Sequence, residues 1–337
     1  MKAVVKEGPG PGFALKEMPR PGVQPGGVIV QVEAVGICGT DIPIFDGIRA
    51  VPPGLIPGHE FAGVIVEVGS GVGGWPCGGR VAVSMVKGCG RCRFCRAGEE
   101  PMCDQLTELG IHVSGAYAEF VAVPDSCLHR LPDSLSFEQG AAVDPIASSY
   151  RGIRKVAVDV EDAVVIFGAG PIALYALQAI KARGVPLVIV VGRSRAPLEA
   201  AIQLGADRVF STLDGGPAAQ VAAWTGGRMA SVVIEATGNA SLLPDVLDCA
   251  AKGARVVLLG IFHDEVMLAP APIVRRELQV VGSFCYSWED FEESLMLLAQ
   301  GRITTQHIVT HVLPLDQVEE ALRVIRERRA IKVVLRP

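Results

Sequence analysis

The stretch VVIFGAGPIA, residues 164–173, decides the fold of the second half of the chain. An apolar run ends at Gly168, a second glycine follows at Gly170, and Pro171 begins a helix-forming run. Gly168 permits a tight turn, and Gly170 lets the backbone approach a pyrophosphate at the N-terminus of the helix. The third glycine of this motif is replaced by Ala173, which the motif tolerates. A strand, a glycine turn and a helix in this order predict dinucleotide binding rather than an ordinary turn.

Apolar strands alternate with helices around this turn. The strands expected are 163–167, 187–191, 208–210, 231–236, 255–260 and 278–283, and helical runs at 171–184 and 196–206 lie between them. Continuous apolar strands separated by helices indicate a parallel sheet that is covered on both faces. Six such strands suit a doubly wound dinucleotide fold.

The first part of the chain has a different pattern of apolar and turn-forming residues. Short β-branched runs broken by Gly and Pro occur at 27–37, 61–69, 80–85 and 117–124. This pattern predicts a mostly antiparallel β domain, so the chain as a whole is expected to be an α/β protein. The last part, from residue 291, predicts an amphipathic helix, a second helix near 314–328 and a closing strand.

Length and charge exclude several classes of function. A chain of 337 residues predicts two domains, and a net charge of -5 argues against a nucleic-acid partner. The longest uncharged run, 164–180, contains two glycines and a proline and is shorter than the ~20 residues of a membrane span. The N-terminus lacks the features of a signal peptide. We therefore expect a cytoplasmic protein without a membrane partner, in which clustered cysteines bind metal or do redox chemistry.

The end of the strand at 187–191 predicts which nicotinamide cofactor binds. The residues that follow are Gly192, Arg193, Ser194 and Arg195, with no carboxylate among them. An acidic residue there would accept a hydrogen bond from the ribose 2′-hydroxyl, whereas basic residues accommodate a 2′-phosphate. NADP is therefore favoured over NAD. The alternative interpretation is that the arginines belong to a solvated loop.

The segment GCGRCRFCRAGEEPMC, residues 88–103, contains four cysteines. These are Cys89, Cys92, Cys95 and Cys103. Four thiolates suit the tetrahedral sphere of a structural zinc, and such a closed sphere leaves no position for a substrate. The bacterial ferredoxin run differs, because its last cysteine is followed by proline and here Asp104 follows. A reactive metal must then lie elsewhere in the chain.

Several motifs resemble those of one family, and they occur in the order of that family. They are GICGTD (36–41), PGHEFAGVIVEVG (57–69), the four-cysteine segment, GAYAEFVAVP (115–124), GAGPIA (168–173), IEATG (234–238) and THVLPLDQVEEAL (310–322). Over essentially its whole length the chain resembles the zinc-containing medium-chain alcohol and polyol dehydrogenases. The resemblance implies a GroES-like catalytic domain over 1–148, a Rossmann domain over 149–284 and a return to the catalytic domain over 285–337.

The resemblance also implies a catalytic zinc. Cys38 and His59 match its ligands, and Glu60 matches a glutamate that binds the metal directly or intermittently. Asp144 matches a carboxylate that completes the sphere in several relatives, so Asp144, Glu60 or water is left as the fourth ligand. Thr40 matches the residue that binds the substrate oxygen and starts a proton relay.

Two features depart from the family pattern, and the first is the missing acidic residue after the strand at 187–191, noted above. Many relatives have a histidine where this chain has Pro43, so the relay must pass through water or another group. The residues predicted to bind the cofactor are Gly168, Gly170, Pro171, Ile172, Gly192, Arg193, Ser194, Arg195, Ala236 and Gly260.

The sequence thus predicts a zinc-dependent oxidoreductase with two zincs per chain. It would transfer a hydride between NADP, or NAD, and a small secondary alcohol or polyol, and the family implies a homodimer or homotetramer. A threonine-type or amino-cyclitol dehydrogenase is the alternative within the family. A non-catalytic NAD(P)-binding redox sensor and an iron–sulfur carrier are alternatives of other classes.

Overall fold

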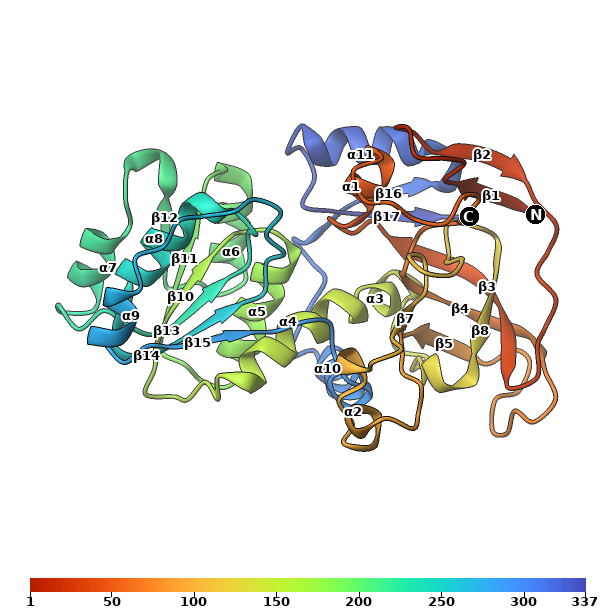
Figure 1. The fold of residues 1–337 in the computed structure, drawn as a ribbon, viewed down its shortest axis with the longest axis horizontal. Helices are drawn as coiled ribbons and strands as arrows, with labels where there is room; N and C mark the ends of the chain where they lie inside the picture. The colour runs from red at the N-terminus through yellow and green to blue at the C-terminus, as the bar shows by residue number, and fades with distance from the viewer. The chain divides into compact units, whose positions relative to one another are not determined.

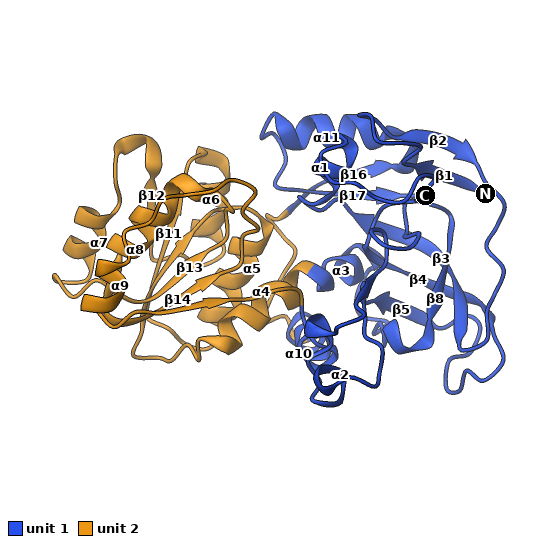
Figure 2. Ribbon diagram, in the orientation of Figure 1, with its two compact units in different colours: residues 1–144, 286–299, 309–337 blue, residues 145–285, 300–308 orange.

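A computed structural model describes residues 1–337, which form two compact units. Unit 1 contains residues 1–144, 286–299 and 309–337, and unit 2 contains residues 145–285 and 300–308 (Figure 2). None of the helices combines the length and the apolar character needed to cross a membrane.

Unit 2 is built on a six-stranded sheet in the order β12-β11-β10-β13-β14-β15, and every neighbouring pair is parallel. The strands are β10 (Ala163–Phe167), β11 (Leu187–Gly192), β12 (Arg208–Ser211), β13 (Ala230–Glu235), β14 (Ala250–Leu258) and β15 (Gln279–Gly282). The helices are α4 (Val143–Lys155), whose first two residues belong to unit 1, α5 (Pro171–Lys181), α6 (Arg195–Gln203), α7 (Ala218–Trp224), α8 (Leu243–Asp248) and α9 (Ala271–Arg275).

Helices cover both faces of this sheet (Figure 1). On one face, Val246 and Leu247 of α8 pack into an apolar core with the strands. On the other, α5 contacts β10 and β11, and its side chains from Ala173 to Ile180 are buried. The strand β10 lies between β11 and β13, so the strand order reverses direction beside β10. Ligands of such sheets bind at the carboxyl ends of the strands at this switch point.

Unit 1 is built on a seven-stranded sheet in the order β16-β17-β3-β4-β5-β9, with β8 also paired to β3. Its strands are β3 (Gly27–Gly36), β4 (Glu60–Val68), β5 (Arg80–Val83), β8 (Phe120–Pro124), β9 (Leu128–Arg130), β16 (Val309–Pro314) and β17 (Lys332–Arg336). All pairs are antiparallel except β16 with β17. Two small antiparallel sheets pair β1 (Lys2–Val5) with β2 (Ala14–Glu17), and β6 (Val86–Lys87) with β7 (Thr107–Glu108).

Short helices complete unit 1. They are α1 (Asp41–Phe45), α2 (Arg93–Arg96), α3 (Phe137–Ala141), α10 (Trp288–Ala299) and α11 (Val318–Arg326). Single 3-10 turns span Glu100–Met102, Asp125–Cys127 and Leu315–Gln317 here, and Thr212–Asp214 and Ala240–Leu242 in unit 2. The predicted α/β class, with one mostly antiparallel sheet and one doubly wound parallel sheet, is confirmed.

The end of the chain differs from the prediction. All of 285–337 was expected to return to the catalytic domain, but residues 300–308 belong to unit 2. The amide side chain of Gln178 on α5 donates to the carbonyl of Thr304 at 3.0 Å and accepts from its N–H at 2.8 Å. This paired contact fixes the segment against α5. The strand β16, which follows, was also absent from the prediction.

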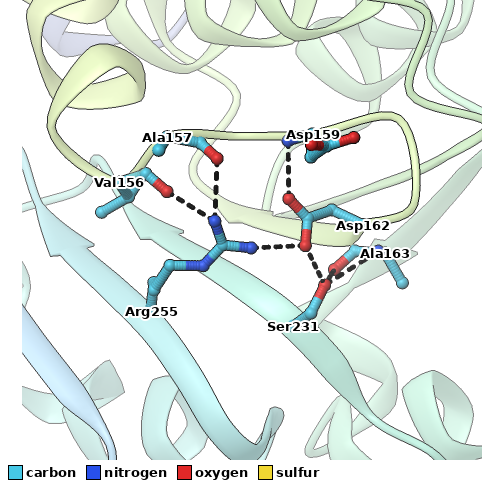
Figure 3. A network of polar contacts seen from close by, with 7 residues as sticks. All are labelled: Val156, Ala157, Asp159, Asp162, Ala163, Ser231 and Arg255. Carbon is cyan, nitrogen blue, oxygen red and sulfur yellow. Dashed lines mark hydrogen bonds and ion pairs between the residues drawn. The ribbon is translucent and has the colours of Figure 1, made fainter.

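A polar network ties the segment that follows α4 to the sheet of unit 2 (Figure 3). The Arg255 guanidinium on β14 pairs with Asp162 and donates to the carbonyls of Val156 and Ala157, each at 2.8 Å. Asp162 also accepts from the Ser231 hydroxyl at 2.7 Å. The Asp162 side chain is only 7% exposed, so these partners replace the water that it loses on burial.

We expect Arg255→Met to lower the free energy of unfolding of unit 2 by about 2 kcal/mol, because it leaves a buried carboxylate and two carbonyls without their donor. Urea unfolding followed by circular dichroism measures this. Arg323→Met is the control, because that exposed arginine pairs only with neighbours on its own helix, and no shift of its midpoint is expected. Equal midpoints for both variants would contradict the role of the network.

Candidate active site

Strand pairing brings Cys38 and His59 together. The strands β3 and β4 are antiparallel, with Gly36 opposite Glu60, so the end of β3 lies beside the start of β4. Cys38 follows β3 and His59 directly precedes β4. One ligand atom each from Cys38, His59 and Glu60 lies within 4.8 Å of the others. We call these three residues the mixed cluster.

Asp41, which the sequence analysis did not select, supports the mixed cluster. Its Oδ2 accepts from the Cys38 N–H at 2.8 Å and from the Tyr117 hydroxyl at 2.7 Å. Its Oδ1 lies 3.8 Å from Nδ1 of His59. The glycine before His59 is required here, because a Cβ on Gly58 would lie 2.4 Å from the Tyr117 ring and φ of Gly58 is +89°. Asp41 therefore fixes the Cys38 loop and faces the imidazole of His59.

Glu60 is held by a buried lysine. Lys332 is the first residue of β17, which pairs with β3. Its ammonium group pairs with Oε2 of Glu60 and donates to the carbonyl of Ile37 at 2.8 Å. Both side chains are almost fully buried, and Gly36 leaves the space that Glu60 occupies. A buried carboxylate needs such a partner, so the ion pair with Lys332 fixes Glu60 beside the other two residues.

Asp144 is not part of the mixed cluster. It lies in the first turn of α4 and is buried. Its Oδ2 accepts a hydrogen bond from the hydroxyl of Tyr286. The structure therefore brings together three of the four predicted ligands and gives the fourth a different partner.

The electrostatics of the mixed cluster fit a divalent cation. Burial disfavours the charged form of His59, but Cys38 and Asp41 more than offset this and raise the pKa of His59 to about 10. Nδ1 of His59 is also buried without a hydrogen-bond partner. A cation bound by the thiolate, imidazole and carboxylate would balance the same acidic groups without that proton. Sulfur, nitrogen and oxygen donors together are a common ligand set of zinc.

The four predicted zinc-binding cysteines also converge. The sulfur atoms of Cys89, Cys92, Cys95 and Cys103 lie within 4.8 Å of one another, and none of the cysteines forms a disulfide. Sγ of Cys103 accepts from the N–H of Cys89 at 3.2 Å. The N–H groups of Arg91 and Cys92 lower the pKa of Cys89 to about 6, whereas burial raises that of Cys95 to about 12. Backbone donors at a sulfur atom favour the thiolate, which is the form that binds metal.

The glycine turn lies at the carboxyl end of β10. Gly168 has a φ of +117°, and its N–H donates to the carbonyl of Val191 at 2.8 Å. Gly170 is the N-cap of α5, and a Cβ there would meet no atom within 4 Å. Pro171 and Ile172 form the first turn of α5. Free N–H groups at this helix start, with open space in front of them, can hold a phosphate.

The residues after β11 differ in their burial and in their ion pairs. Gly192 is buried against Leu198, and Ser194 is the N-cap of α6. Arg195 pairs with Glu199 one turn later, at 2.7 Å. Arg193 is exposed and has no ion-pair partner. Arg193 is therefore the better candidate of the two arginines for binding a phosphate.

Glu235 was missed by the sequence analysis. It ends β13, is fully buried, and accepts from the N–H groups of Thr237 and Gly238 at 2.6 and 3.2 Å. Gly260 donates to its carbonyl at 3.2 Å. Glu235 thus orders the loop after β13, which contains Ala236, and contacts the loop after β14, which contains Gly260. An acidic residue that ends a buried apolar strand was the available signal, because such a carboxylate needs partners.

Known proteins resemble the chain in both parts. Residues 24–133 match the alcohol dehydrogenase GroES-like domain, and residues 171–300 match the zinc-binding dehydrogenase domain. Sorbitol dehydrogenase of Halalkalibacterium halodurans is 32% identical over 341 residues, which cover 100% of this chain and 99% of that protein. The chain belongs to the zinc-containing medium-chain alcohol dehydrogenase family. L-threonine 3-dehydrogenase of Saccharopolyspora erythraea is 33% identical, covering 99% of this chain and 98% of its own length.

Solved structures agree with this family. A protein described as a short chain alcohol dehydrogenase, from E. coli CFT073 and complexed with NADH, has a TM-score of 0.93 and 29% identity. A protein from Sinorhizobium meliloti 1021 bound to NADP has a TM-score of 0.91 and 31% identity. Each likeness covers 100% of this chain and 99% of the other. The protein is thus an NAD(P)-dependent zinc alcohol or polyol dehydrogenase, with two clusters of metal-binding side chains.

We expect Cys95→Ser to remove one zinc per chain and to lower the thermal midpoint, because three remaining thiolates hold the lobe less firmly. Metal analysis and calorimetry measure these changes. Cys77→Ser is the control, since that exposed cysteine lies outside both clusters. Protein that survives purification should keep most of its kcat. A Cys95→Ser protein with wild-type stability and no activity would show that the two metal clusters had been assigned the wrong roles.

Proposed function

We propose that the protein transfers a hydride between NADP and a secondary alcohol or polyol, interconverting the alcohol and its ketone. The mixed cluster carries this proposal, because it offers metal-binding atoms from Cys38, His59 and Glu60 at one buried point. In this proposal that cluster binds the catalytic zinc and the four cysteines bind a structural zinc. Zinc, when bound, would polarise the substrate oxygen as a Lewis acid, while NADP⁺ would accept the hydride from the alcohol or NADPH would supply it to the ketone.

Neighbouring residues of the chain position the metal-binding side chains and the substrate hydroxyl. Asp41 lies 3.8 Å from Nδ1 of His59 and would help to orient the imidazole that holds the metal. Lys332 holds Glu60 in place through an ion pair. Oγ1 of Thr40 is buried without a hydrogen-bond partner, so it is available to accept the proton of a substrate hydroxyl. Pro43 cannot take that proton further, and water or another group must do so.

Arg193 supports the choice of NADP. Its exposed guanidinium follows β11 and has no ion-pair partner, whereas Arg195 is paired with Glu199. No carboxylate stands at 192–195 to accept a hydrogen bond from a ribose hydroxyl. A free guanidinium at this position would pair with the 2′-phosphate that distinguishes NADP from NAD.

L-threonine is the second candidate substrate. The sorbitol and L-threonine dehydrogenases named above share 32% and 33% identity with this chain, so identity does not separate them. A panel of polyols, simple secondary alcohols, L-threonine and amino-cyclitols, each assayed with NAD and NADP, tests the proposal. Turnover of L-threonine alone would replace the polyol assignment.

Self-association and location follow from the family resemblance. We propose a homodimer or homotetramer in the cytoplasm. Light scattering on the purified protein tests the first part, and a monomer at micromolar concentration would contradict it.

Cys38→Ser tests the catalytic assignment. We expect one zinc per chain instead of two, a folded protein by circular dichroism, and a kcat lowered by roughly a thousandfold or more, because the metal that activates the substrate is lost. Cys127→Ser, at a buried cysteine outside both clusters, is the control. A wild-type protein with one zinc and no NAD(P)-linked oxidation of any alcohol would favour a redox sensor. A brown protein with visible absorbance would favour an iron–sulfur carrier.

Arg193→Asp tests the cofactor assignment. We expect the ratio of kcat/KM for NADP to that for NAD to fall by about a hundredfold, because a carboxylate repels the 2′-phosphate and accepts from a ribose hydroxyl. Arg195→Asp is the matched control, and a smaller change is expected there because Arg195 is already paired. An unchanged ratio in Arg193→Asp would refute the preference for NADP.

A further inference from the structure

The hydroxyl of Tyr286 is fixed between two elements of unit 1. It lies within hydrogen-bond distance of Oδ2 of Asp144, in the first turn of α4. It also accepts the N–H of Met85, which follows β5, at 3.1 Å. Because Met85 supplies a donor, the single phenolic proton points to the carboxylate of Asp144. The bond therefore has a defined direction, from Tyr286 to Asp144.

Packing also holds the ring of Tyr286 in place. The side chain is 1% exposed, and its ring lies 5.4 Å from that of Phe291 at an interplanar angle of 50°. Asp144 is 5% exposed. Neither group can turn to water without breaking the contact, so this hydrogen bond sets the position of the carboxylate.

Asp144 lies near the mixed cluster, but its oxygens are not among the clustered ligand atoms. Its charge acts on His59, but its oxygens do not join the ligand atoms of Cys38, His59 and Glu60 that lie within 4.8 Å of one another. Three protein ligands leave zinc a position for substrate, whereas four close the sphere. The position of Asp144 therefore decides whether the site is open.

We propose that Tyr286 is a positioning residue, whose hydroxyl holds Asp144 outside the mixed cluster and so keeps one coordination position open for the substrate. This inference rests on the proposed catalytic role of the mixed cluster. In this inference Asp144 does not bind the metal while its hydrogen bond to Tyr286 is intact. Loss of the hydroxyl allows Asp144 to bind the metal.

The test is Tyr286→Phe, which removes the hydroxyl and keeps the ring. With Co²⁺ in place of zinc, we expect the visible absorption of the mixed cluster to change, as a new oxygen ligand enters. We also expect metal loss from this cluster to a chelator to slow about tenfold, and kcat/KM to fall about ten- to a hundredfold, the usual range for partners of metal ligands. The Co²⁺ spectrum of Cys38→Ser gives the contribution of the four cysteines, which is subtracted.

The double variant Tyr286→Phe with Asp144→Asn isolates the carboxylate. An amide is a weaker ligand, so we expect the spectrum and the rate of metal loss to return toward those of the wild type. Tyr150→Phe, a tyrosine on the later part of α4, is the matched control and should change neither property.

Two results would overturn the inference. Faster metal loss in Tyr286→Phe would mean that the tyrosine only supports the structure. A changed spectrum that persists in the double variant would mean that Asp144 is not the entering ligand. Both measurements are made without substrate. A failure here is therefore distinct from a failure of the proposed function, which Cys38→Ser decides by metal content and turnover.

Discussion

The antiparallel register of β3 and β4 is the constraint on which the rest of the site depends. Gly36 opposite Glu60 places the residues after one strand beside those that begin the other. A shift by one residue would turn Glu60 to the opposite face of the sheet. Buried apolar side chains on both strands favour this register, so the packing of the core also positions the metal-binding group.

The polar groups of the site are positioned by residues that come from distant parts of the chain. Asp41 faces His59, Lys332 pairs with Glu60, and Tyr286 donates to Asp144. Each acidic group is buried, and each has at least one polar partner. Because an unpaired buried carboxylate is costly, these partners fix where every possible ligand points. Asp144 is as good a metal ligand as Glu60 by its chemistry. In this account its hydrogen bond with Tyr286, and not its chemistry, keeps it out of the mixed cluster.

The two units divide the work of binding. In unit 2, the turn at Gly168 and the loop ordered by Glu235 lie at the carboxyl ends of β10 and β13, which are neighbours in the sheet. That is where parallel sheets bind nucleotides. In unit 1, the four cysteines converge in a lobe that contains only short elements, and in the proposed function they hold a structural zinc there.

Much of the fold and both metal clusters were predictable from the sequence. The apolar strands of unit 2 and the turn at Gly168 carry local signals, and β10 was predicted residue for residue. The partners of the ligands were not predictable. Lys332 lies far from Glu60 in sequence, as Tyr286 does from Asp144, and only tertiary pairing brings each pair together. Gln178, which binds residues near 304, carries no signal because a glutamine on a buried helix resembles many others.

Crystallographic data collected above and below the zinc absorption edge test the central claim most directly. The account predicts two anomalous peaks per chain, one among the four cysteine sulfurs and one in contact with Cys38 and His59. It predicts that Asp144 remains bonded to Tyr286 and does not contact the second peak. A single peak at the four cysteines, from protein that oxidises an alcohol at full rate, would contradict the account.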